Sequence, residues 1–192
     1  MKKLGYILFF ILFVTGQVFA QDDRYKNTFV CTRGKAHFFS KTPVEDIEAT
    51  TYKAACVLNT ETRKVSVKIP IISFKFANGL MEQHFNENYM ETDKYPSAVL
   101  DAVVSNTDID FSRDGYYDVE LRGSLEIHGV KQERVIYGKL VVMNGQVSSA
   151  TANFDVKLVD HKIEVPKLVF ANIAEVIKVD VEFVFQRYQK AN

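Results

Sequence analysis

Hydrophobic and polar residues alternate strictly over residues 117–128. Six polar positions alternate there with six apolar or glycine positions, which are Tyr117, Val119, Leu121, Gly123, Leu125 and Ile127. A period of two is typical of a β-strand with one buried face and one solvent-facing face. The same alternation recurs from Val65 to Ile71 and from Val179 to Phe185. Strands of this kind must bury their apolar faces together, in a sandwich or in a closed barrel.

Short turns separate this segment from other extended segments of the same kind. We predict strands over residues 28–40, 47–58, 64–76, 97–105, 116–127, 133–143, 146–159 and 176–187. Gly34 interrupts the first of them, where a bend or a bulge is expected. Asn144 and Gly145 lie between two predicted strands and form the strongest short hairpin signal of the chain. Consecutive strands are therefore expected to be antiparallel.

One segment has a different period. Between Leu80 and Met90, apolar and aromatic residues recur every three to four positions, which indicates one or two helical turns on the surface or over a barrel end. Tyr95-Pro96 ends this segment, because the residue before a proline is pushed out of the helical conformation. The whole pattern predicts an all-β fold, an eight-stranded antiparallel barrel whose closure removes both sheet edges. Its interior can be filled by side chains or can hold one slender ligand.

Residues 1–20 have the pattern of a secretory signal peptide. Lys2 and Lys3 precede an almost wholly apolar run, and Val18-Phe19-Ala20 has the small-x-small form of a cleavage site. The run is short for a membrane span, and an uncleaved anchor is the alternative. We expect cleavage after Ala20, a periplasmic or secreted location, and one barrel domain over residues 21–192 without stable membrane insertion.

The charge of the chain is balanced. It carries 24 basic and 24 acidic side chains, and removal of Lys2 and Lys3 from the basic set leaves 22 against 24. This balance gives no electrostatic footprint for nucleic acid or for an anionic membrane surface. The oligomeric state is not indicated.

Two cysteines, Cys31 and Cys56, are the only ones in the chain. If residues 28–40 and 47–58 form a hairpin that turns around Pro43-Val44, facing residues have numbers that sum to 87. Cys31 and Cys56 meet this condition, so a cross-strand disulfide is geometrically plausible. Two buried free thiols that fill small core positions are the alternative.

Catalytic and metal-binding patterns are missing from the sequence. None of the four histidines has a metal-ligand spacing, and His37 and His128 are interpreted as solvated. There is no GxSxG elbow, no phosphate-binding glycine loop and no reactive cysteine signature. We therefore predict no catalytic residue, no metal site and no cofactor. The aromatic residues are more informative, because they can line a cavity or pack an ordinary core.

Several sequence blocks resemble the YceI-like family of bacterial exported proteins. They are HFNENYMETDKYPSAVL (residues 84–100), GSLEIHGV (123–130), FDVKLVDHKIEVPKLV (154–169) and, upstream, GKAHFFSKTPVEDIEA (34–49). The resemblance implies a lipocalin-like barrel that encloses a polyisoprenoid or another amphipathic lipid, without catalysis. It places His84, Phe85, Tyr89, Met90, Tyr95 and Pro96 in a segment across the barrel mouth, and it makes Leu125, Ile127, Phe154, Val156 and Leu158 point inward.

The chain departs from the family pattern at two places. His161 stands where a tyrosine is common, and Lys131-Gln132 replaces a turn that usually begins with threonine. The chain has no tryptophan and so lacks the GxW signature of true lipocalins. These departures leave the fold intact but bear on the identity of the ligand.

The leading hypothesis is a non-enzymatic protein that binds, sequesters or transports such a lipid in its barrel. The residues expected to line the cavity are Phe74, Phe76, Met81, His84, Phe85, Tyr89, Leu100, Leu125, Ile127, Phe154, Val156, Leu158 and Phe183. One alternative is an envelope interaction module with a solidly packed interior. Another is an enzyme that uses His84 with a neighbouring carboxylate.

Overall fold

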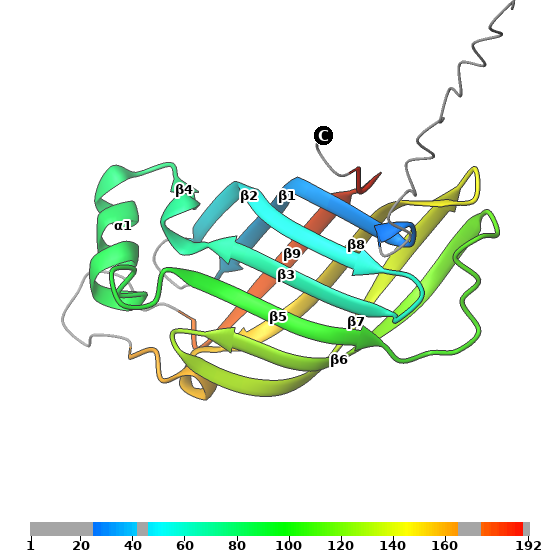
Figure 1. Ribbon diagram of the computed structural model, residues 1–192. Helices are drawn as coiled ribbons and strands as arrows, with labels where there is room; N and C mark the ends of the chain where they lie inside the picture. Colours follow the sequence, from blue (N-terminus) through cyan, green and yellow to red (C-terminus); the bar gives the residue numbers. More distant parts are fainter. Residues whose placement is uncertain (1–24, 42–45, 165–173, 190–192) are drawn as a thin grey trace, which may run out of the picture.

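The computed structural model describes residues 25–41, 46–164 and 174–189, which form an antiparallel β-barrel (Figure 1). The predicted signal peptide and the Pro43-Val44 turn lie outside these residues. Eight strands make the barrel: β1 (Thr28–Ser40), β2 (Ile47–Asn59), β3 (Lys64–Pro70), β5 (Ser97–Val104), β6 (Gly115–Ile127), β7 (Val130–Met143), β8 (Gln146–Lys157) and β9 (Val176–Val184). Two-residue strands β4 (Lys75–Phe76) and β10 (Gln186–Arg187) extend the sheet.

The barrel closes through β1, which pairs with β2 on one side and with β9 on the other. Around the rest of the wall, the order is β9, β8, β7, β6, β5, β3 and β2, and every pairing is antiparallel. The predicted eight-stranded antiparallel barrel is confirmed. Since the first and last long strands are neighbours, neither is left as a free edge.

The alternation along the strands sorts side chains between the inside and the outside of the barrel. In β6, Val119 and Leu125 are buried, and Leu121 and Ile127 pack against the same core. Tyr116, Asp118 and Arg122 on the other face are exposed. The apolar face of β6 therefore points toward the barrel interior, as its period of two predicts.

The predicted register of the first hairpin is confirmed. Thr28 faces Asn59, Cys31 faces Cys56 and Ser40 faces Ile47, so each pair sums to 87. The register shifts on both sides of Gly34 and then returns to the same sum, which is how a β-bulge acts. Both cysteines are buried free thiols in this structure, and a bond between them stays a prediction.

Two tight turns join strands with backbone angles of the left-handed region. Asn144 (φ 54°) and Gly145 (φ 64°) connect β7 to β8, and this predicted hairpin is confirmed. The predicted strands leave residues 128–132 as the connection between β6 and β7, and the predicted start of the second strand at residue 133 is wrong. His128 (φ 52°) and Gly129 (φ 70°) make the turn, so that β7 begins at Val130.

The prediction of a single long strand over residues 64–76 is also wrong. β3 ends at Pro70, because a proline has no N–H to continue the ladder. A 3-10 turn over Ile71–Ser73 follows, and β4 then pairs with β2. This break brings Phe74 and Phe76 to the end of the barrel.

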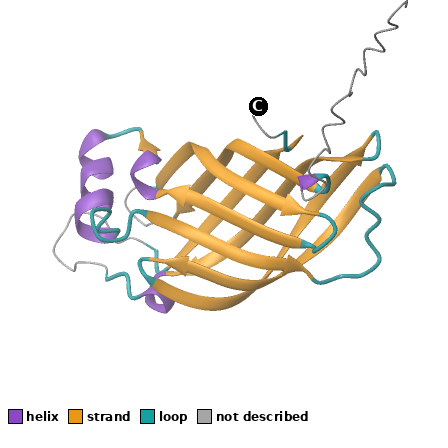
Figure 2. Ribbon diagram, in the orientation of Figure 1, coloured by secondary structure: helices purple, strands orange, loops and turns teal. Residues whose placement is uncertain are grey.

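The predicted helical segment lies at that same end of the barrel, which we call the helical end (Figure 2). It consists of α1 (Gly79–His84) and a π-helical turn over Phe85–Tyr89. The Asn78 side chain caps the helix by accepting a hydrogen bond from the Leu80 N–H at 2.8 Å. A further 3-10 turn, Leu158–His161, follows β8 at the helical end. No helix in the described part of the chain is long and apolar enough to cross a membrane.

Candidate functional site

A cavity of about 380 Å³ lies inside the barrel at its helical end. Strand side chains form its wall, and α1 with the π-helical turn covers it. Among the described residues, 23 line this space, and of these only Ser40, Asn78, His84 and Tyr89 bring polar side-chain atoms. We call this space the wide chamber. An apolar wall with few polar groups is characteristic of small-molecule binding sites, whose volumes usually lie between about 300 and 1,000 Å³.

The barrel interior narrows beyond the wide chamber. A second space of about 90 Å³, the narrow chamber, extends between Cys56, Leu140 and Phe183. Four residues line both chambers, and we call this boundary between the two the constriction: Ile69, Ala98, Leu125 and Phe154. The interior is thus hollow at the helical end and nearly filled by side chains farther along. It is not a uniformly packed core.

All thirteen residues that were predicted to line a cavity line at least one of the two chambers. Leu100 and Phe183 line only the narrow chamber, and Leu125 and Phe154 belong to the constriction. The others line only the wide chamber: Phe74, Phe76, Met81, His84, Phe85, Tyr89, Ile127, Val156 and Leu158. Their contact with a ligand stays a prediction.

Some residues that line the wide chamber were not predicted from the sequence. Phe38 and Ile47 come from the first hairpin, and Ile163, Ile177 and Val179 come from the far end of the chain. Phe38 and Ser40 share the inner face of β1 with buried Ala36, so the period of two beyond Gly34 could have identified them. For Ile163, no comparable signal exists, because it follows a 3-10 turn.

Four phenylalanines form a cluster that fixes the helical segment to the barrel. Phe85, at the start of the π-helical turn, has its ring centre 5.3 Å from that of Phe38, 5.0 Å from Phe76 and 6.0 Å from Phe74. Such separations are within the range of favourable aromatic pairs, each worth about 0.5–1.5 kcal/mol beyond burial. The cluster therefore holds the cover of the wide chamber through packing.

Polar contacts hold the same cover from outside. Glu82 in α1 forms an ion pair with Lys75 and accepts a hydrogen bond from the Phe76 N–H at 3.4 Å. The Lys75 hydrogen bond holds the pKa of the Glu82 carboxyl below its usual value. A solvent-open groove along α1 is lined mostly by charged and amide side chains and lacks the apolar wall of the wide chamber.

The sequence blocks around Tyr95 and Gly129 meet at the helical end. His128 Nε2 lies 3.2 Å from a carboxylate oxygen of Glu91, and the His128 ring lies 4.3 Å from that of Tyr95. A Cβ atom on Gly129 would stand 2.6 Å from the Tyr95 ring, so only glycine fits there. We call the Glu91–His128 contact the latch. The expectation that His128 is solvated is wrong, since its side chain is only 11% exposed.

Burial affects two further groups near the wide chamber. It raises the pKa of the Tyr89 hydroxyl, which keeps this group neutral and able to donate a hydrogen bond. It also lowers the pKa of His161, whose side chain is fully buried. His161 Nδ1 donates to the Val130 carbonyl oxygen at 3.1 Å, and within the described residues Nε2 has no hydrogen-bond partner. His161 ends the 3-10 turn Leu158–His161; the first residue of this turn, Leu158, and Ile163 just after it line the wide chamber.

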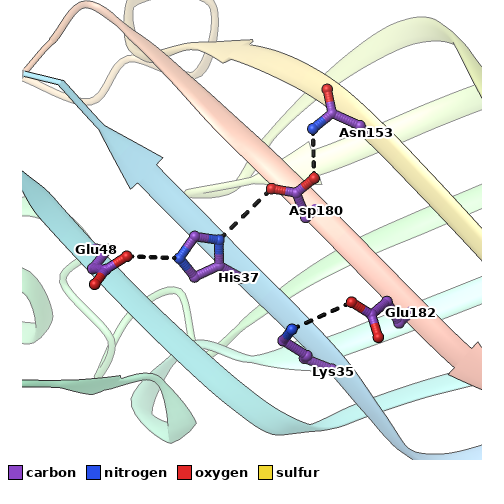
Figure 3. Close-up of polar contacts among 6 residues, drawn as sticks. All are labelled: Lys35, His37, Glu48, Asn153, Asp180 and Glu182. Atoms are coloured by element: carbon purple, nitrogen blue, oxygen red, sulfur yellow. Dashed lines mark hydrogen bonds and ion pairs between the residues drawn. The ribbon is translucent and has the colours of Figure 1, made fainter.

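Ionic contacts join neighbouring strands on the outer wall of the barrel (Figure 3). His37 on β1 lies between two carboxylates, 3.2 Å from that of Glu48 on β2 and 3.7 Å from that of Asp180 on β9. Lys35 and Glu182 pair at 3.2 Å beside them. Among the residues that the structure describes, no group of three or more His, Cys, Asp or Glu side chains is arranged to hold a metal ion.

Comparison with known proteins agrees with this architecture. A family model for the YceI-like domain matches residues 28–185. The chain belongs to the YceI-like family. The match runs from the first residue of β1 to just past the end of β9, so it covers the whole barrel. No curated protein matches the chain.

Solved structures similar to this YceI-like barrel share its fold at low identity. A polyisoprenoid binding domain from Saccharophagus degradans, implicated in plant cell wall breakdown, has a TM-score of 0.67 at 15% identity, and the match covers 84% of this chain and 99% of that domain. BcnA from Burkholderia cenocepacia has a TM-score of 0.61 at 14% identity, with 79% and 95% covered. The YceI protein of Campylobacter jejuni has a TM-score of 0.57 at 15% identity, with 78% and 90% covered.

Proposed function

We propose that this protein binds the apolar chain of an amphipathic lipid, of the polyisoprenoid class, inside its barrel and catalyses no reaction. The observation that carries the proposal is the wide chamber, a hollow of about 380 Å³ with a nearly apolar wall. Membership of the YceI-like family supports it. The name of the Saccharophagus degradans domain, which shares the fold, supports the choice of ligand class.

Affinity in such a site comes from the removal of apolar ligand surface from water. Each buried methylene contributes about 0.8 kcal/mol, at about 25 cal/mol per Å². Dissociation constants are therefore expected to fall about fourfold with each methylene added to the ligand, as long as the added group enters the barrel. Once the accessible chamber is full, further lengthening should bring no gain.

Polar groups orient the other end of the ligand in this proposal. Asn78, His84 and Tyr89 line the wide chamber on the side of the helical segment. The Tyr89 hydroxyl and the His84 ring can donate hydrogen bonds to an alcohol or ester oxygen, or accept one from an alcohol. A head group held there would leave its apolar chain pointing toward the constriction.

The pattern of residues 1–20 supports export, and we infer that the mature barrel carries or sequesters its lipid in the periplasm or outside the cell. A closed barrel suits this role, since it hides an insoluble chain from water without inserting into a membrane.

Lipid extraction tests the proposal directly. The protein is purified from a bacterial envelope fraction, and the extract is analysed by mass spectrometry. Ala98→Phe places a ring in the constriction and at the wall of the wide chamber, whereas Val103→Phe places the same ring on the exposed face of β5. We expect extractable lipid from the natural protein and from Val103→Phe, and at least about tenfold less from Ala98→Phe. Equal lipid contents in all three proteins, or none in any, would contradict the proposal.

A further inference from the structure

Cys31 and Cys56 lie directly opposite each other in the wall of the barrel. They are paired residues of antiparallel strands β1 and β2, and both side chains are buried on the inner face. Opposed residues in antiparallel strands have Cα atoms about 4.5–5.5 Å apart, which is within the span of a disulfide. A bond between the two sulfur atoms therefore requires rotation of the side chains and no change of register.

The two cysteines also lie next to an irregular part of the ladder between β1 and β2, where a covalent link would hold the strands together. The ladder between β1 and β2 is irregular immediately after Cys31, where the register shifts before and after Gly34. A Cβ atom on Gly34 would stand 2.4 Å from the Phe183 ring. The lack of a side chain at Gly34 therefore leaves room for this ring. Cys56 lines the narrow chamber together with Phe183. A bond between the cysteines would join the strands beside their weakest pairing.

We propose that Cys31 and Cys56 form a structural disulfide that closes the β1–β2 hairpin, and that it forms before the barrel closes. The oxidant is a disulfide of a thiol–disulfide oxidoreductase or of a small thiol such as glutathione. One cysteine thiolate attacks this disulfide, forms a mixed disulfide and expels a first thiolate. The second cysteine then attacks the mixed disulfide and expels a second thiolate. Both leaving thiolates take up the protons released by Cys31 and Cys56.

The order of events follows from burial. In the folded barrel, desolvation, with a smaller contribution from the neighbouring Cys31, raises the pKa of the Cys56 thiol to about 12. The thiolate is the attacking species, so exchange in the folded barrel is slow. The two strands are neighbours in the chain, and a hairpin forms before the distant pairing of β1 with β9. The hairpin thus offers both thiols to an oxidant while they are still exposed.

Refolding under redox control tests this proposal. The full chain is unfolded and reduced, then refolded in a mixture of reduced and oxidised glutathione. We expect a mass lower by two hydrogen atoms, a linked peptide that contains Cys31 and Cys56, and no thiol that reacts with maleimide in denaturant. The reduced protein that is folded first should oxidise in the same mixture at least about a hundredfold more slowly.

Three outcomes would overturn the proposal: two free thiols after refolding, glutathione adducts in place of the internal bond, or disulfide-linked dimers. Equal oxidation rates for folded and unfolded protein would overturn the proposed order. Cys31→Ala and Cys56→Ala serve as controls. In the natural sequence the urea midpoint should be higher in the oxidised form than in the reduced form, whereas in the variants it should not depend on the redox mixture.

Discussion

Leu125 is the residue through which the hollow interior can be tested most sharply. It lies in the constriction, lines both chambers and is 6% exposed. Leu125→Ala removes three carbon atoms, which corresponds to a transfer free energy of about 2.4 kcal/mol at 0.8 kcal/mol for each group. In a closed core the new cavity adds to this cost, and totals of about 2.7–5 kcal/mol are typical. Because Leu125 already borders open space, we expect a loss of about 2–3 kcal/mol.

The same substitution should change which ligands bind best. Removal of the side chain widens the passage between the chambers, so a longer apolar chain can reach the narrow chamber. Up to three additional methylene equivalents can then be buried, worth about 2.4 kcal/mol or a factor of about 60 in affinity. The assay is isothermal titration with prenyl alcohols of two, three and four isoprene units. The variant should gain affinity only for the alcohols that are too long for the natural wide chamber.

A matched control separates this effect from a general loss of stability. Ile109 has the same number of side-chain carbons as Leu125 and the same 6% exposure, and it lines neither chamber. Ile109→Ala should lower the free energy of unfolding by at least as much as Leu125→Ala and leave the length preference unchanged. If both variants prefer the same alcohol as the natural protein, the constriction does not limit the ligand and the reasoning is refuted.

Three further predictions concern the wall, a buried base and the latch. Gly123→Ala would put a Cβ atom 2.1 Å from the Asp101 carbonyl oxygen, so the urea midpoint of this variant should fall sharply. A Cβ atom on Gly79 would have no neighbour within 4 Å, so Gly79→Ala should leave the urea midpoint of the protein unchanged or raise it. Burial lowers the pKa of His161 in the folded protein. As the pH drops below about 6.5, the unfolded chain therefore binds a proton at this histidine before the folded protein does, and the free energy of unfolding should fall. His161→Gln should flatten this fall, by at most about 1.4 kcal/mol per pH unit, and an unchanged profile in pH-dependent urea unfolding would contradict the assignment. Glu91→Ala removes the oxygen atoms that His128 contacts and so breaks the latch. Stopped-flow measurements should then show a few-fold faster release of a bound prenyl alcohol, whereas an unchanged release rate would mean that the latch does not hold the cover.

The fold could be predicted because the strand pattern and the turns are local properties. A period of two identified the inner face of β6, and the sum of 87 for facing residues gave the register of β1 and β2. The errors occurred where a single residue overrides such a pattern. Pro70 ends β3 within an apolar run, and His128 adopts a positive φ, which is uncommon for a residue other than glycine.

The sequence was enough to predict which residues would face the interior, but it was not enough to predict the shape of the cavity. An inward-pointing position follows from alternation, so the nominated residues could be found along the strands. Whether they fill the interior depends on how side chains from segments far apart in the chain pack together, as Phe38 packs against Phe85. Such contacts leave no periodic signal, and the division into two chambers therefore required the structure.

The pairing of β1 with β9 has a consequence for the folding of this protein. Lys35 and Glu182 form a contact across this seam although 147 residues separate them in the chain (Figure 3). During folding, β1 can pair with β2 at once, but its other edge has no partner until β9 reaches it. Over that interval the partly folded protein has an open strand edge that can pair with other chains. The nine residues of β9 thus decide when this strand edge is covered, and a chain that stops before Val176 cannot close its barrel.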